Sequence, residues 1–250
     1  MVKFASAHLL PLKSPMEFKV IEDALAGTGL IVRGGFNPIT EDGDEIPHDE
    51  ILNGAETVVL VGNAGAAMWR AFAAATTTRA RAGDAAPLDG WTREVLTEAA
   101  GRLGAKALFP FTGPPYLPFQ RWALRAGGVH VSPIGPLIDP EYGLWHAYRG
   151  ALAFDQRFDL PPTSESPSPC EACADKPCLS TCPVSALTPG NYDVPACVAH
   201  IGSQVEAGAG GEDCLGGGCL ARRACPVGRE YIQEPEQARF HMTKFLKAQS

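Results

Sequence analysis

The sequence predicts an α+β protein in two parts: an N-terminal α/β domain in residues 1–160 and a small loop-rich domain in residues 161–250. Three observations predict this division. Segments with strand periodicity alternate with segments of helical periodicity as far as residue 154. The stretch 160–169, with four prolines and three serines, has the composition of a linker. All eight cysteines of the 250-residue chain come after this stretch.

The first elements are a helix and a strand. Ser14–Glu17 has the pattern of a capping box with proline at the first helical position, and the apolar residues of 18–25 share one helical face. Residues 30–32 are predicted to form a strand that enters a turn at 34–38. The acidic segment 39–50 is predicted to be a surface loop or hairpin.

Two further pairs of elements follow. Residues 56–61 are rich in β-branched side chains and predict a buried strand, and the alanine-rich segment 64–78 predicts a helix. Asp89 is the candidate N-cap of a second helix, which ends near Leu103. Residues 107–109 then predict another strand.

The remaining elements are short. A helix is predicted at 118–126 and a strand at 149–154, which completes the first domain. In the second domain we expect short helices after Pro183 and over 194–205. A last helix is expected to begin at Pro235. The residues expected to dock it on the core are Phe240 and Phe245.

The cysteines form two runs. The first has the spacing Cys-x2-Cys-x4-Cys-x3-Cys-Pro from Cys170, and the second has the spacing Cys-x4-Cys-x5-Cys-Pro from Cys214. Closely spaced thiolates converge on a soft metal centre, and bacterial ferredoxins use a run Cys-x2-Cys-x2-Cys-x3-Cys-Pro whose fourth cysteine binds the other of two clusters. Eight thiolates divide into two sets of four, so we expect two 4Fe-4S clusters.

The simplest partition of the ligands exchanges the last cysteines of the two runs. One cluster then has the ligands Cys170, Cys173, Cys178 and Cys225, and the other has Cys182, Cys197, Cys214 and Cys219. Zinc ribbons are an alternative, but they rarely place both fourth cysteines before proline without a histidine ligand. A disulfide framework is a second alternative, and it needs an oxidising compartment.

Residues 1–10, the lengths of the apolar runs and the net charge predict the cellular compartment and the classes of partner. Residues 1–10 lack the apolar core and cleavage site of a signal peptide, and no apolar run approaches ~18 residues, so we expect a cytoplasmic protein with reduced thiols and no membrane partner. The net charge of -7 argues against nucleic acid as a partner. Arg222, Arg223 and Arg229 are expected to form a solvated face, with a local basic patch as the alternative.

Several segments before the cysteines resemble known families. Phe111–Pro114, Arg125–Gly127 and Gly135–Gly143 resemble the region that precedes the cysteines in epoxyqueuosine reductases and reductive dehalogenases. Gly54–Phe72 and Asp139–Gly150 resemble the cobalamin-processing CblC family. These resemblances imply a first domain of nitroreductase-like or CblC-like fold that holds a corrinoid (cobalamin), followed by a two-cluster ferredoxin-like domain.

The resemblances also imply roles for individual residues. Arg149 matches a family arginine and is a candidate to bind a carboxylate or the corrin edge, with a structural salt bridge as the alternative. Tyr142 and Trp145 are candidate corrinoid contacts, with core packing as the alternative. The histidine loop Asp-x-His-x-x-Gly that binds cobalt in some cobalamin enzymes is absent. Phe111 stands where epoxyqueuosine reductases have an acidic proton donor, so reduction of epoxyqueuosine is disfavoured.

The function expected from these observations is electron transfer. A donor such as a flavodoxin, a ferredoxin or a reductase would reduce the clusters, which would pass single electrons to a corrinoid or a corrinoid protein. Whether this makes the protein an enzyme, an iron-sulfur oxidoreductase, stays open. One alternative is a plain electron-transfer protein without a corrinoid. A first domain whose pocket is filled by its own side chains would favour this alternative. The other is a flavin-dependent reductase.

Overall fold

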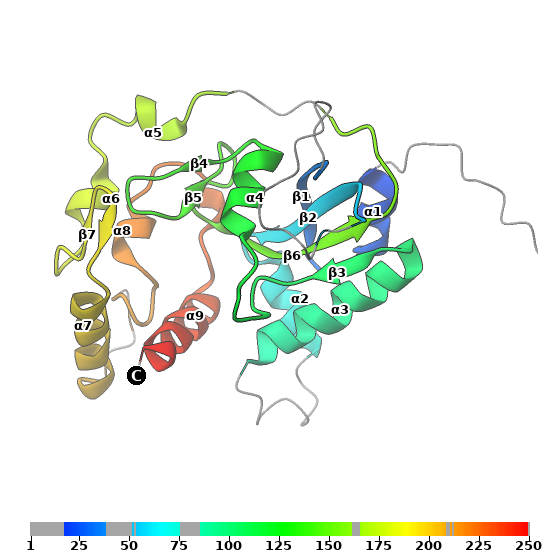
Figure 1. Ribbon diagram of the computed structural model, residues 1–250. Helices are drawn as coiled ribbons and strands as arrows, with labels where there is room; N and C mark the ends of the chain where they lie inside the picture. Colours follow the sequence, from blue (N-terminus) through cyan, green and yellow to red (C-terminus); the bar gives the residue numbers. More distant parts are fainter. Residues whose placement is uncertain are drawn as a thin grey trace, which may run out of the picture.

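The structure, a computed structural model, describes residues 18–38, 52, 54–75, 86–161, 166–208, 211 and 213–249. Its centre is a four-stranded sheet in the order β1-β2-β6-β3 (Figure 1). The strands are β1 (Ile31–Phe36), β2 (Thr57–Ala64), β6 (His146–Phe154) and β3 (Lys106–Leu108). Every neighbouring pair is antiparallel, so the chain belongs to the α+β class that the sequence predicted.

Helices cover both faces of this sheet. On one face lie α1 (Phe18–Ala24), α2 (Ala67–Ala75) and α3 (Pro87–Leu103), and on the other lies α4 (Phe119–Ala126). Val59 and Val61 belong to the first core, and Val58 and Leu60 belong to the second, because successive side chains of a strand point to opposite faces. In the described part of the chain no helix has the length and apolar composition of a membrane span.

The turn expected at 34–38 is wrong, because β1 continues through both glycines. Gly34 has a φ of 88°, and the register with β2 shifts between Val32 and Gly35. A Cβ on Gly35 would lie 2.8 Å from the carbonyl oxygen of Val58. The glycines therefore form a bulge where two backbones approach closely, and they do not end the strand.

The N-cap expected at Asp89 is also wrong. Helix α3 begins at Pro87 with Ala86 as its N-cap, since proline is favoured at the first helical position. Asp89 lies in the first turn and forms an ion pair with Arg149 at 3.0 Å. The Asp89 carboxylate therefore pairs with a residue distant in the sequence and does not cap the helix. The expected capping box at 14–17, the acidic segment 39–50 and residues 76–78 of the second expected helix lie outside the described residues.

The cysteine-rich part consists of short elements, after a small hairpin of β4 (His130–Val131) and β5 (Leu137–Ile138). In order they are α5 (Pro169–Ala172), α6 (Pro177–Ser180), β7 (Leu187–Thr188), β8 (Asn191–Tyr192), α7 (Val194–Glu206), α8 (Leu220–Arg223) and the 3-10 helix η3 (Arg229–Tyr231). The helix predicted over 194–205 is confirmed. The short helix expected after Pro183 is wrong, because the hairpin β7-β8 turns at Gly190, whose φ is 75°.

The last helix, α9 (Pro235–Ala248), begins at the predicted proline and contacts both parts of the chain (Figure 1). The Phe240 ring lies 5.1 Å from the ring of Trp69 and 6.0 Å from the ring of Phe72, both on α2. Phe245 packs with Ile201 of α7. Both docking residues expected from the sequence are therefore used, and the domain boundary at residue 160 stays a prediction.

Replacing Phe240 by alanine is expected to lower the free energy of unfolding by about 2 kcal/mol. Removal of a fully buried phenyl ring costs about 3 to 5 kcal/mol, and this ring is only partly buried. The thermal midpoint followed by circular dichroism measures the effect. Leu124→Ala removes an apolar side chain that is 43% exposed and serves as the control. Equal midpoints for the two variants would show that α9 contributes nothing through Phe240.

Candidate functional site

The first four of the predicted ligands lie around one cavity. Its lining includes Cys170, Cys173, Cys178 and Cys225. Burial raises the pKa of the Cys178 thiol, and Cys225, Cys170 and Cys173 raise it further because nearby thiolates repel. Burial likewise raises the pKa of Cys225, with Cys170 and Cys173 adding to the rise.

The other four cysteines form a second set. Burial raises the pKa of the Cys214 thiol, and smaller contributions come from Cys219, Cys197 and Cys182. The pKa of Cys219 is raised by burial and, to a lesser degree, by Cys197 and Cys182. The sets adjoin, since Cys182 and Cys219 pack at the edge of the apolar cluster that contains Cys178 and Cys225. All eight cysteines lie in the described part of the chain and are free thiols.

Among the described residues, no group of three or more histidine, cysteine, aspartate or glutamate side chains is placed to hold a metal ion. A single ion needs all its ligands around one point, whereas each thiolate of a 4Fe-4S cluster binds a different iron. The structure thus shows two sets of four thiols, and their role as cluster ligands stays a prediction.

Backbone N–H groups donate hydrogen bonds to several of the sulfurs. The N–H of Ala186 lies 3.3 Å from Sγ of Cys182. Hydrogen bonds from the backbone of Arg222 and Ala221 oppose the rise in the pKa of Cys219 that burial causes. Such bonds stabilise negative charge on sulfur, and a coordinating metal removes the remaining thiol protons.

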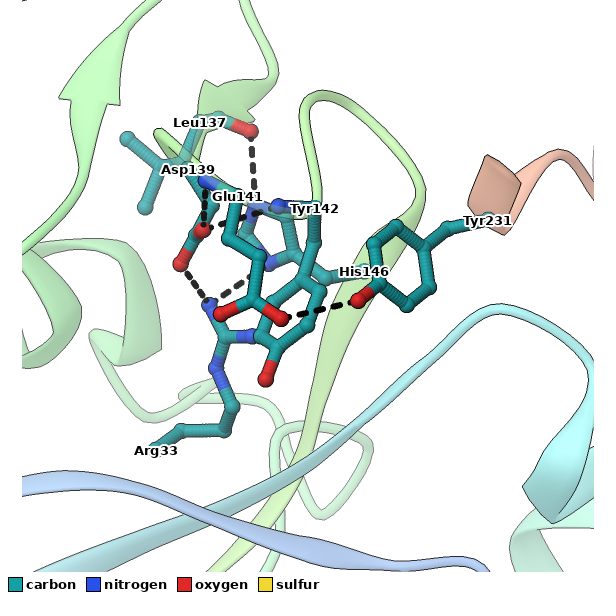
Figure 2. Close-up of polar contacts among 7 residues, drawn as sticks. All are labelled: Arg33, Leu137, Asp139, Glu141, Tyr142, His146 and Tyr231. Atoms are coloured by element: carbon teal, nitrogen blue, oxygen red, sulfur yellow. Dashed lines mark hydrogen bonds and ion pairs between the residues drawn. The ribbon is translucent and has the colours of Figure 1, made fainter. Parts of the chain in front are cut away.

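Beside the first cysteine set lies a turn at 139–143, which we call the joint turn. The Asp139 carboxylate holds it, because Oδ1 accepts the backbone N–H groups of Glu141 and Tyr142 at 2.8 and 2.9 Å. Oδ2 of Asp139 accepts Nη2 of Arg33 at 2.7 Å (Figure 2). The joint turn is thereby tied to β1, which precedes it by 106 residues.

Arg33 is a buried cation, with 4% of its side chain exposed. Its guanidinium lies 4.8 Å from the centre of the Tyr142 ring, and its Nη2 lies 3.4 Å from Nδ1 of His146 (Figure 2). Burial, and then the Arg33 charge, lowers the pKa of His146 to about 4. His146 is therefore neutral at pH 7, so Nε2 donates to the carbonyl of Leu137 at 3.0 Å and Nδ1 faces the arginine as an acceptor.

The joint turn is in backbone contact with the segment that follows the last cysteine. Gly143 has a φ of 57°, and a Cβ there would lie 2.0 Å from the carbonyl oxygen of Val227. Gly228 has a φ of 68°, and a Cβ there would lie 2.3 Å from the carbonyl carbon of Tyr142. Only glycine fits at either position. The polypeptide directly after Cys225 therefore rests against the joint turn.

Side chains reinforce this contact. The hydroxyl of Tyr231 donates to Oε1 of Glu141 at 2.8 Å, and the ring of Tyr231 meets the ring of Tyr142 edge-on at 4.8 Å (Figure 2). Ile138 and Leu144, on either side of the turn, belong to the apolar cluster of Cys178 and Cys225. The joint turn therefore connects the sheet with the first cysteine set.

Arg222 makes a second connection. Its Nε donates to the carbonyl of Leu144 at 2.8 Å, and its guanidinium lies 4.5 Å from the centre of the Trp145 ring. Burial lowers its pKa to about 10, and nearby Cys219 opposes this shift, so the side chain stays charged at neutral pH. The expectation of a solvated face at Arg222, Arg223 and Arg229 is therefore wrong for Arg222, which is partly buried, and of the three only Arg229 is exposed.

The side chains expected to contact a corrinoid each have other partners in the structure. Tyr142 lies between Arg33 and Tyr231, and Trp145 is 2% exposed beneath Arg222. Arg149 forms the ion pair with Asp89 and lines a cavity of about 150 Å³ whose described lining does not include Tyr142 or Trp145. The structure thus contains the salt bridge and the aromatic packing that were the alternative interpretations. Corrinoid binding by these residues stays a prediction.

The sequence interpretation missed Arg33, Asp139 and His146 as one site. A signal was present, because Arg33 interrupts an otherwise apolar strand, and a buried cation needs a partner. Nothing in the sequence indicated that the partner is Asp139.

The fold is shared with proteins of known structure. No protein-family model matches the sequence, and no curated protein is significantly similar to it. A selenomethionine-labelled epoxyqueuosine reductase is 18% identical, with 88% of this chain and 68% of that chain covered and a TM-score of 0.53. An epoxyqueuosine reductase with a modified tRNA stem loop is 18% identical over 88% and 69% of the two chains, with a TM-score of 0.50.

The third similar structure is the B12-trafficking protein CblC of C. elegans. It is 13% identical, with 91% of this chain and 93% of that chain covered, and the TM-score is 0.52. At these identities the likeness concerns the fold. The expected resemblance to epoxyqueuosine reductase and CblC is confirmed at that level: the chain has the α+β fold shared by epoxyqueuosine reductase and CblC.

Proposed function

We propose that this protein is a two-cluster iron-sulfur electron carrier that reduces a corrinoid held by its N-terminal domain. The observation that carries the proposal is the arrangement of eight thiols in two adjoining sets of four. The clusters would supply one-electron transfer. Their ligands would be Cys170, Cys173, Cys178 and Cys225 for one cluster, and Cys182, Cys197, Cys214 and Cys219 for the other.

The chain contributes position and charge. The joint turn and Arg222 hold the cysteine-rich part against the end of the sheet. The Arg222 cation and the N–H donors near Cys219 stabilise the negative charge of that cysteine set. We place this activity in the cytoplasm, with a flavodoxin, a ferredoxin or a reductase as the donor.

The corrinoid is supported by the fold shared with a B12-trafficking protein. Reduction of epoxyqueuosine remains disfavoured, because Phe111 offers no proton. The expectation against nucleic acid rested on net charge, and the tRNA stem loop bound to a protein of this fold shows that the fold does not exclude such a partner.

Titration of cob(II)alamin with anaerobic protein tests the corrinoid. We expect the cobalt electron-spin-resonance spectrum to shift to a base-off, weakly ligated form. The proposed site withholds axial ligands from cobalt, and the sequence has no Asp-x-His-x-x-Gly loop whose histidine could take the place of the cobalamin base. Cob(II)inamide, which has no nucleotide base, is the control and should show no such shift. A spectrum that remains that of free cobalamin at saturating protein would rule out the corrinoid.

A plain electron-transfer protein is the second candidate. The observation in its favour is that Tyr142 and Trp145 are covered by Arg33, Tyr231 and Arg222. In that case the first domain would dock a redox partner. The same titration separates the two functions.

A further inference from the structure

A large cavity lies at the open edge of the sheet. It has a volume of about 820 Å³, within the range of small-molecule sites, and its lining includes strand β3 and the loop Thr112–Pro118. Strand β3 is the last of the sheet, paired only with β6 among the described strands. Its outer edge can therefore offer backbone hydrogen-bond donors and acceptors to a ligand.

The charge of this cavity has one sign. Arg93 of α3, Lys106 of β3 and Arg121 of α4 line it, and none of the described lining residues carries a carboxylate. None of the three cations forms an ion pair with a described residue. Three cations from three elements, without an ion-pair partner among the described residues of a chain of net charge -7, favour an anionic ligand.

One of these cations is held in place by aromatic rings. The guanidinium of Arg93 lies 4.9 Å from the centre of the Phe109 ring and 5.2 Å from that of Phe111. This contact fixes the side chain without using its N–H donors, since a cation interacts with the face of a ring. The donors are therefore available to a planar or tetrahedral anion such as phosphate.

The cavity also carries an aromatic ring at its rim. Tyr116 is 67% exposed, on a loop that contains Pro114, Pro115 and Pro118. The prolines restrict the backbone on both sides of the tyrosine. An exposed ring on a rigid loop offers a stacking surface for a flat heterocycle.

We infer that this cavity binds a nucleotide, with its phosphate at Arg93, Lys106 and Arg121 and its base stacked on Tyr116. The nucleotide has two sources: a free mononucleotide, or the nucleotide tail of a complete corrinoid. Only the second source rests on the proposed function.

Isothermal titration of the full-length protein with adenosine 5'-monophosphate (AMP), adenosine and inorganic phosphate tests the site. AMP should bind at least about tenfold more tightly than adenosine, because each charge-assisted hydrogen bond contributes roughly a factor of ten. Arg93→Gln and Arg121→Gln should each weaken AMP about tenfold and leave adenosine unchanged. Arg239→Gln removes an exposed cation outside the cavity and should have no effect.

The stacking surface is tested separately. Tyr116→Ala should weaken AMP roughly tenfold and leave inorganic phosphate unchanged, and Tyr116→Phe should retain the wild-type affinity. All these substitutions are at exposed positions, so the fold is preserved, and unchanged circular dichroism verifies this. If AMP binds no more tightly than adenosine, or if Arg239→Gln weakens it as much as Arg93→Gln, the inference is wrong.

Competition identifies the source of the nucleotide. If cobalamin displaces AMP and cobinamide does not, the corrinoid tail is the ligand; if neither displaces it, the ligand is a free mononucleotide. Equal displacement by both would mean that the corrin ring is recognised and would overturn the nucleotide site. AMP binding together with a negative cob(II)alamin titration would retain the site and reject the proposed function.

Discussion

Cys225→Ser is expected to remove about half of the iron and sulfide from the protein, in which anaerobic purification should yield about eight of each. In our partition Cys225 completes the set of Cys170, Cys173 and Cys178, so its loss should damage that cluster and leave the other largely intact. Iron and sulfide analysis measures the content. Spin-resonance spectra of the reduced protein show which cluster signal remains.

A reciprocal variant and a neighbouring one are the controls for this prediction. Cys219→Ser should abolish the opposite signal, since its thiol interacts with Cys197 and Cys182. Ser180→Ala changes an exposed hydroxyl between two cysteines of the first run and should retain both signals. Loss confined to the cluster of Cys214 and Cys219 in the Cys225→Ser variant would refute the partition. One or two zinc ions with little iron in the wild type would refute the clusters.

Gly228→Ala is expected to lower the free energy of unfolding by about 2 to 5 kcal/mol. Part of the cost is the positive φ of 68°, about 1 to 2 kcal/mol for an L-residue. The rest is overpacking, because the new Cβ would lie 2.3 Å from the backbone of Tyr142, and backbone cannot rotate away as a side chain can. The joint turn must then separate from the segment after Cys225.

Thermal unfolding and the loss of iron-sulfur absorbance on heating measure this effect. Gly104→Ala is a matched control, because Gly104 has a φ of 67° and a Cβ there would meet no atom within 4 Å. It should cost only the contribution of the positive φ, about 1 to 2 kcal/mol. If Gly228→Ala lowers the midpoint no more than Gly104→Ala, the contact between the joint turn and the cysteine segment does not stabilise the protein.

Local features were predictable because short-range chemistry determines them. The spacing of the cysteines predicted two runs of closely spaced thiols, and in the structure Cys170, Cys173, Cys178 and Cys225 line one cavity. Which four thiols bind each cluster stays a prediction. The helices at 194–206 and 235–248 begin beside prolines and carry their apolar residues at helical spacing. These signals act within a few residues, so sequence alone suffices to find them.

Other local signals were overruled by contacts with distant residues. Gly34 and Gly35 would permit a turn, but β1 continues through them, and a Cβ on Gly35 would lie 2.8 Å from the carbonyl oxygen of Val58 in the neighbouring strand. The Asp89 carboxylate could cap a helix, but Asp89 lies inside the first turn of α3 and its carboxylate pairs with the partly buried side chain of Arg149. In both cases a residue has two possible uses, and only the position of a remote partner decides between them.

The sequence by itself thus determined most of the helices and strands and the α+β class. Only the tertiary structure decided that Arg33 is neutralised by Asp139, that Arg222 covers Trp145 and that Arg93, Lys106 and Arg121 surround one cavity. The physical reason is that these groups are brought together by the order of strands in the sheet and by the return of the chain after Cys225. Periodicity and spacing do not indicate which distant residues come into contact. Which charged side chains share a site depends on those contacts.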